Sequence, residues 1–64
     1  NNVEEGLARV LEIFRYLDGV YQKALDVTDA EGDDVTNDIF VGAKAELEKN
    51  IWMVAAELGQ EPGL

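Results

Sequence analysis

Apolar residues recur every three or four positions along the first half of the chain, and this spacing predicts a long amphipathic helix over residues 3–29. One seam is formed by Val3, Leu7, Val10, Phe14, Leu17, Tyr21 and Ala24, in the steps of four and three that are typical of one helix face. A second stripe is formed by Ile13, Tyr16, Val20 and Val27, roughly a quarter-turn from the first. Because one partner helix can bury only one stripe, two apolar faces imply two sets of neighbours.

A second helix is predicted over residues 34–58. Its main seam is formed by Phe40, Leu47, Ile51, Val54 and Leu58. The run from Ile51 to Ala56 is apolar on every side, and a helix that is apolar all round is normally buried all round. Trp52 and Met53 are therefore expected in a core. A lone pair of helices cannot bury such a segment, so we expect further helices from a bundle or a larger assembly.

The residues that flank the two helices carry the usual signals for helix ends. Asn2 is a suitable N-cap for the first helix, and Asp33 or Asp34 can cap the second. Gly32 and Gly59 suit the left-handed conformation that commonly follows a helix. The predicted architecture is an all-α hairpin, with an acidic turn at about residues 30–33 and a short surface tail at residues 59–64.

Composition narrows the class of protein. The chain has 64 residues, no Cys, no His and a net charge of −9. One domain of this size has a marginal core, and such an acidic segment repels nucleic acid, so DNA binding through it is not expected. No apolar stretch reaches the ~18 residues that a membrane span needs. We expect a soluble, cytoplasmic, all-helical segment.

The acidic segment over residues 29–38 is the main candidate for chemistry. Asp34 and Asp38 lie four residues apart on one helix face, and Asp29 precedes them across the turn. Like charges at this spacing destabilise a helix by ~0.2–0.5 kcal/mol unless a cation is near. An EF-hand calcium loop is excluded, because Gly32 at its sixth position would put Val27 at the first. Two interpretations stay open: an ordinary solvated turn, or a place where carboxylates of neighbouring subunits collect cations.

Catalysis by this chain alone is not expected, because it has no His, Cys or Ser. The acids Glu46, Glu48 and Glu57 are interpreted as solvated charges on a helix face. Lys44 and Glu48 have the spacing of a surface ion pair of minor value. We therefore assign no catalytic and no cofactor-binding residue.

Two stretches resemble a known family. LDVTDAEGDDVTNDIF (residues 25–40) and ELEKNIWMVAAELGQEPGL (residues 46–64) are similar to the C-terminal part of Dps proteins, the DNA-binding proteins from starved cells. The similarity is greatest to the Dps-like peroxide-resistance proteins of lactic acid bacteria. It extends, nearly without gaps, from about Val10 to Leu64.

The resemblance implies a fold and a function. Dps proteins are ferritin-like four-helix bundles that form homo-oligomeric shells of twelve subunits, oxidise Fe(II) with peroxide and store the ferric mineral. This chain would supply half of such a bundle, and its N-terminal helices would be the missing partners. The family's ferroxidase ligands lie on those missing helices. The resemblance assigns Asp29, Asp34 and Asp38 to an acidic pore that admits iron, with no tight iron site in this chain alone.

An alternative uses the same helices without any metal. The hairpin could be a structural module that dimerises into a four-helix bundle. That alternative predicts a particle of twice the 7.1-kDa chain mass that is indifferent to iron. The Dps interpretation predicts a shell when the partner helices are present.

Overall fold

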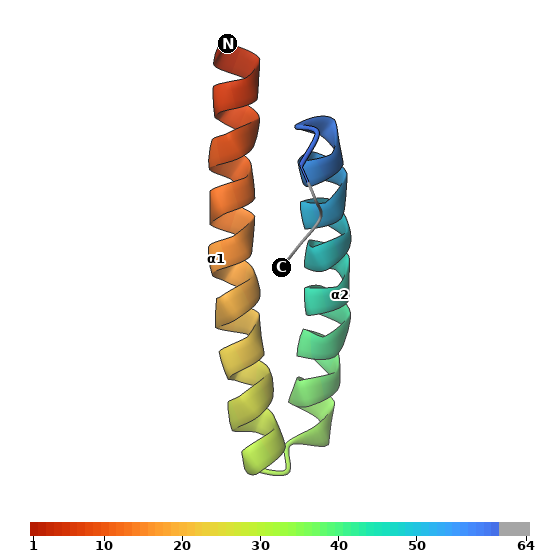
Figure 1. Ribbon diagram of the computed structural model, residues 1–64. Helices are drawn as coiled ribbons and strands as arrows, with labels where there is room; N and C mark the ends of the chain where they lie inside the picture. Colours follow the sequence, from red (N-terminus) through yellow and green to blue (C-terminus); the bar gives the residue numbers. More distant parts are fainter. Residues whose placement is uncertain (61–64) are drawn as a thin grey trace.

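The computed structural model describes residues 1–60 and consists of two antiparallel helices, α1 (Asn2–Ala30) and α2 (Asp34–Glu57), joined by a short turn (Figure 1). The predicted all-α hairpin is confirmed, and the observed helix bounds differ from the expected ones by one residue at most. Residues 61–64 of the expected surface tail lie outside the described part of the chain.

The first helix begins one residue earlier than expected. The side-chain Oδ1 of Asn1 accepts a hydrogen bond from the backbone N–H of Glu4 at 2.9 Å, so Asn1 is the N-cap. The prediction of Asn2 as the cap was wrong, because Asn2 is already the first residue of α1 and the N-cap is the residue that precedes it. Glu4 and Glu5 occupy the first turn, where their charges interact favourably with the helix dipole.

The core lies along the line where the helices meet. Leu11, Leu47, Ile51 and Ala55 are buried, and the partly buried apolar residues packed on them are Phe14, Leu17, Tyr21, Val54 and Leu58. The rings of Tyr21 and Phe40 lie 5.9 Å apart at 54°, a tilted arrangement that aromatic pairs favour. The seam predicted for α2 is therefore observed, with Ala55 added to it.

The predicted seam of α1 is wrong at Val3 and Val10, whereas Leu7 between them is partly buried as predicted. Leu11 is 3% exposed, whereas Val10 is 37% exposed and Val3 is more exposed still. Neighbouring positions on a helix differ by about 100° around its axis. The angle at which α2 crosses α1 therefore selects Leu11 in place of Val10, and no local pattern specifies that angle.

The same type of hydrogen-bonded cap ends both helices. At the end of α1, Gly32 N–H donates to Asp29 O and Asp33 N–H donates to Thr28 O. Gly32 and Gly59 have φ of 69° and 72°, as predicted for the left-handed residue of this cap. Asp33 then caps α2 by accepting from Thr36 N–H at 3.1 Å. The chain thus reverses direction within three residues.

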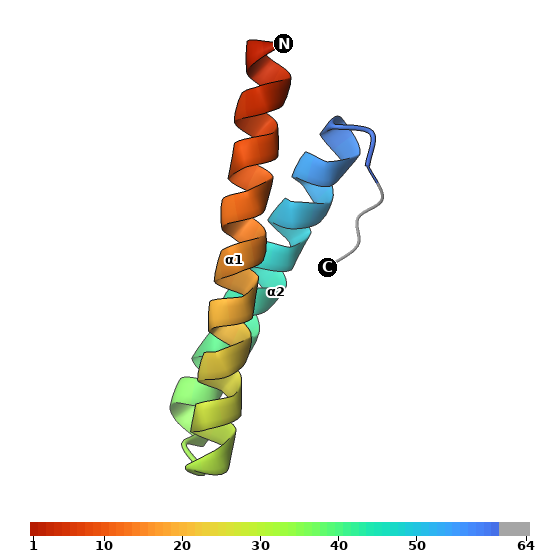
Figure 2. The ribbon, with the colours of Figure 1, turned by 60° about the vertical axis from the view of Figure 1, so that its left-hand side comes forward.

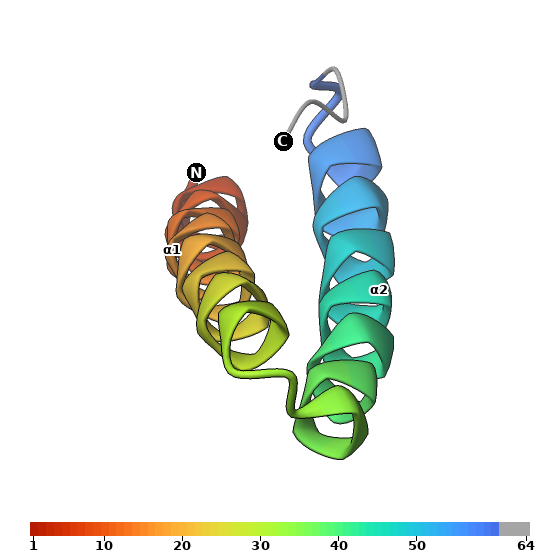
Figure 3. The same cartoon turned by 90° about the horizontal axis from the view of Figure 1, so that it is seen from below.

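The hairpin is long and thin, with extents of 46 × 15 × 14 Å. The helices lie closest near the turn and diverge toward the N-terminus of α1 (Figures 2 and 3). Trp52 and Met53 are 60% and 58% exposed, so the expectation that they lie in a core is not met within this chain. A pair of helices has only one mutual interface, so the all-apolar run in α2 keeps two of its sides uncovered.

Neither helix in the described part of the chain has the length and apolar character needed to cross a membrane.

Candidate functional site

The acidic corner is held in shape by a small hydrogen-bonded network between the helix ends. The Thr28 hydroxyl donates to Ala24 O at 2.8 Å, and it is buried at the end of α1. The Asn37 side-chain Nδ2 in α2 donates to Thr28 Oγ1 at 3.0 Å and to Leu25 O at 3.1 Å. These bonds fix the first turn of α2 against α1. Asp34 and Asp38 are held in place with it, because Asn37 lies between them in sequence.

Asp33 has a structural role in this corner. Its hydrogen bonds with the side chain and backbone of Thr36 hold the pKa of its carboxyl below the usual value of 3.8. A carboxylate that caps a helix start is stabilised in its charged form by the N–H groups it faces. Asp33 therefore ends the turn by acting as the N-cap of α2.

The three predicted pore residues are all exposed, but the chain does not bring them together. Asp34 and Asp38 line one open hollow, together with Val35, Asn37 and Ile39. Asp29 lies at the end of α1 and is outside that lining. Within residues 1–60, no group of three or more carboxylates is close enough to hold a metal ion. The assignment of Asp29, Asp34 and Asp38 to a pore stays a prediction that concerns several copies of the chain.

The end of α1 carries acids where a helix dipole favours cations. Its last turn holds no basic residue, and Asp26, Asp29 and Glu31 are all exposed there. Asp26 accepts a hydrogen bond from Gln22 Nε2 at 3.0 Å. The mismatch with the dipole costs a few tenths of a kcal/mol per exposed group, roughly. Surplus negative charge is therefore a property of this end of the hairpin.

A second charged cluster was missed by the sequence analysis. Lys44 Nζ lies 3.5 Å from Asp18 Oδ1 and forms an ion pair with Glu48 Oε2 in the middle of the hairpin. The side chains of Asp18, Lys44 and Glu48 are 17%, 18% and 28% exposed. The interpretation of Glu48 as a solvated charge, and of its pair with Lys44 as a surface contact, was wrong. Both groups lie against α1.

The cluster contains two carboxylates for one ammonium group. Burial and the neighbouring Glu48 raise the pKa of Asp18 above 3.8, and Lys44 opposes this rise. The hydrogen bond from Lys44 lowers the pKa of Glu48 and raises that of Lys44. Oδ1 of Asp18 is buried and accepts no hydrogen bond within the described residues. Lys44 therefore compensates Glu48 better than it compensates Asp18.

One sequence signal could have revealed this cluster. Asp18 lies seven residues after Leu11 and seven before Leu25, so it occupies a seam position of α1. Lys44 lies four residues after Phe40 and three before Leu47, on the seam of α2. A charge at a seam position is normally paired when buried, and opposite charges on two facing seams indicate a contact.

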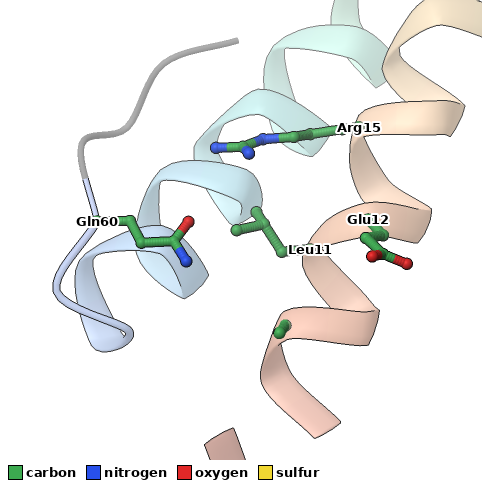
Figure 4. Close-up of a pocket in the computed structure, with 5 residues that line it drawn as sticks. Leu11, Glu12, Arg15 and Gln60 are labelled. Carbon is green, nitrogen blue, oxygen red and sulfur yellow. The ribbon is translucent and has the colours of Figure 1, made fainter. Parts of the chain in front are cut away.

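The open end of the hairpin has a pocket of about 190 Å³, lined by Ala8, Leu11, Glu12, Arg15 and Gln60. Figure 4 shows Leu11 and Arg15 extending from α1 toward α2, with Gln60 beyond the end of α2. The pocket exists because the helices diverge there. Its lining holds one acid and one base, so it resembles a packing defect more than a ligand site.

A family model described as a ferritin-like domain matches residues 1–63. The chain belongs to the ferritin-like family. Two antiparallel helices with unburied apolar sides agree with half of a ferritin-like four-helix bundle.

The similar curated proteins all carry the name DNA protection during starvation protein. One from Streptococcus suis is 64% identical over 62 residues, which is 97% of this chain and 36% of that relative. One from Listeria innocua is 45% identical over 58 residues, 91% of this chain and 35% of the relative. One from Agrobacterium fabrum is 29% identical over 59 residues, 92% and 36% respectively. The chain thus spans about a third of the length of these relatives, and its resemblance to a segment of a Dps protein is confirmed.

Proposed function

We propose that this ferritin-like chain is part of a subunit of an iron-storing, peroxide-protective shell, and that its acidic corner helps to form the pore through which Fe²⁺ is admitted. In this proposal iron is cargo. Its oxidation belongs to helices of the subunit other than α1 and α2, because this chain has no His and no Cys. The relatives' name supports a protective role in starvation.

The observation that carries the proposal is the placement of Asp34 and Asp38. Both are exposed and open onto one hollow at the tip of the hairpin, while Asn37 between them is anchored to α1. A carboxylate pair at the tip, with no ion-pair partner among residues 1–60, suits a site shared between subunits. Asp29 adds a third carboxylate on the other side of the turn.

Symmetry would multiply these charges. If three subunits met at their tips, three carboxylates from each would surround one opening. Clefts lined by charge of one sign focus the field and raise the local concentration of the opposite ion. Carboxylate oxygens without histidine or thiolate suit hard cations that keep part of their water. Hydrated Fe²⁺ could therefore pass without being trapped.

The proposed shell gives no role in DNA binding to this segment. A net charge of −9 over 64 residues repels the phosphate backbone, which supplies most of the affinity of non-specific binding. Any protection of DNA by the parent protein would work through removal of iron and peroxide, or through basic segments elsewhere.

The proposal is tested in the full-length protein by the double variant Asp34→Asn with Asp38→Asn. Its matched control is Glu46→Gln with Glu57→Gln, which removes the same charge from exposed positions of α2. We expect the corner variant to take up Fe²⁺ severalfold more slowly and to lose most of the dependence of the uptake rate on ionic strength. Stopped-flow absorbance of the ferric product measures both.

The control separates a pore from a general charge effect. If the corner variant and the control slow uptake equally, the acids act only through total charge. Unchanged uptake in the corner variant, with the shell intact by sedimentation, would defeat the assignment of the pore.

A further inference from the structure

The side chain of Asn37 joins the two helices at the tip of the hairpin. Its amide nitrogen has two N–H groups, and it donates to Leu25 O at 3.1 Å and to Thr28 Oγ1 at 3.0 Å. These acceptors lie twelve and nine residues away in sequence, on α1. Asn37 is partly buried as a result, whereas a polar residue near the start of an exposed helix is normally solvated.

Thr28, the partner of Asn37, is itself held in place by further bonds. It is 8% exposed, and its hydroxyl donates to Ala24 O at 2.8 Å. The lone pairs of a hydroxyl oxygen remain free to accept a second bond, which Asn37 supplies. The carbonyl of Thr28 accepts from Asp33 N–H at 2.9 Å. Thr28 is therefore joined to the start of α2 through both its side chain and its backbone.

The bonded pair lies beside the three predicted pore residues in sequence. Thr28 directly precedes Asp29, while Asn37 directly precedes Asp38 and follows Asp34 by three residues. Residues within one turn of a helix keep their relative positions, because the backbone hydrogen bonds fix that turn. The bond between Thr28 and Asn37 therefore sets where the carboxylate on α1 lies relative to the two on α2.

The carboxylates have little support of their own. Asp29, Asp34 and Asp38 are exposed, and none of them has an ion-pair partner among residues 1–60. Their placement consequently depends on the backbone that carries them. Groups that act together on a ligand are held in position by neighbours whose side chains are locked by hydrogen bonds, and the bonded pair of Thr28 and Asn37 has this character.

We propose that Thr28 and Asn37 are positioning residues for the entry of Fe²⁺, and that their hydrogen bond fixes Asp29 relative to Asp34 and Asp38. The inference deepens the proposed function and rests on it. Neither residue carries charge, and Thr28 is outside the lining of the hollow that the two carboxylates of α2 share. Their effect on iron is therefore exerted through the placement of the carboxylates.

Symmetry makes the placement matter. In an assembly of identical subunits, a shift of the first turn of α2 against α1 is repeated in every copy. An opening lined by three such tips would change at all of its carboxylates together. The total charge around the opening would stay the same, so a positioning defect differs from a loss of charge in what it does to iron uptake.

The test uses the full-length protein with Thr28→Val or Asn37→Leu. Each variant keeps the approximate shape of the side chain, removes its hydrogen-bonding group and leaves the net charge unchanged. Stopped-flow absorbance of the ferric product is measured over a series of Fe²⁺ concentrations. We expect the half-saturating Fe²⁺ concentration to rise severalfold. The maximal rate should stay near that of the wild type, because oxidation belongs to other helices, and the dependence on ionic strength should be retained.

Three control variants separate positioning from stability. Thr28→Ser keeps the hydroxyl and should behave as the wild type. Val54→Ala removes apolar packing from the body of the hairpin, so it should lower the melting temperature without changing the half-saturating concentration. Combining Thr28→Val with Asn37→Leu should raise that concentration no more than Asn37→Leu alone, because both changes act on one bond.

Several results would overturn the proposal, all read in assemblies that are intact by sedimentation. One is a half-saturating concentration in Thr28→Val and Asn37→Leu that matches Val54→Ala. Another is a Thr28→Ser protein that is as impaired as Thr28→Val. Because Thr28→Val is the milder change, it decides the question if Asn37→Leu fails to fold.

The carboxylate variant of the proposed function distinguishes the two possible failures. If Asp34→Asn with Asp38→Asn slows uptake while Thr28→Val and Asn37→Leu do not, the pore stands and only the positioning role is wrong. If that carboxylate variant leaves uptake unchanged, the proposed pore fails and the positioning role fails with it.

Discussion

Replacing Lys44 by Met in the full-length subunit removes the cation that neutralises Asp18 and Glu48 between the two helices. Met keeps the apolar length of the lysine side chain, so the packing against the seam is largely preserved. What changes is the charge, because two carboxylates then face each other with no ammonium group between them. Within the described part of the chain, Asp18 Oδ1 already accepts no hydrogen bond, and Glu48 would lose its ion pair as well.

The size of the stability loss caused by Lys44→Met follows from the burial of the cluster of Asp18, Lys44 and Glu48. Removing one partner of a fully buried pair costs roughly 3–5 kcal/mol. Because these side chains remain 17–28% exposed, water screens part of the charge, and we expect a loss of about 2–3 kcal/mol at neutral pH. That is a large share of the ~5–15 kcal/mol that stabilises a typical domain.

The way in which the stability loss of Lys44→Met changes with pH shows whether the loss is electrostatic. Without the lysine, both carboxylates would have raised pKa values, so their repulsion is present at neutral pH and disappears as acid protonates them. Urea denaturation followed by circular dichroism at several pH values measures this. The loss of stability should shrink as the pH falls toward 4, roughly the usual range of carboxyl groups.

Adding Asp18→Asn to Lys44→Met should restore about half of the loss, since a single carboxylate then remains. If Lys44→Met is neutral at pH 7, or costs the same at every pH, the cluster has no electrostatic role in stability.

Two further predictions concern the same hairpin. Asp18→Asn alone should raise the free energy of unfolding at neutral pH by about 1 kcal/mol, because the raised pKa of Asp18 means that stability is lost as the pH rises through that pKa. The pH dependence that remains should be a loss of stability in acid, which is expected from the lowered pKa of Glu48. A series of denaturation curves that matches those of the wild type would contradict this prediction. Asn37→Ala should lower the free energy of unfolding by about 1–2 kcal/mol, since Leu25 O and Thr28 Oγ1 lose their hydrogen-bond donor. Thermal melts measure this loss, with Asn50→Ala on α2 as the matched control.

The sequence by itself determined the local structure. Spacing of apolar residues set the two helices, and the pattern Gly32-Asp33 set where the chain turns, because a left-handed residue and an N-cap are chosen by the residues beside them. It also indicated that two helices could not bury their own apolar sides, as the exposure of Trp52 and Met53 shows. The resemblance in residues 25–64 was enough to indicate the Dps family.

Only the tertiary structure decided how the helices are turned toward each other. One residue shifts a helix face by about 100°, and the crossing of α2 over α1 therefore placed Leu11 rather than Val10 in the core. The same packing drew Asp18, Lys44 and Glu48 into one cluster, although they come from different helices. Within residues 1–60 it brings no three carboxylates close enough to hold a metal ion. Contacts across space depend on the relative rotation of the helices, which no short stretch of sequence encodes.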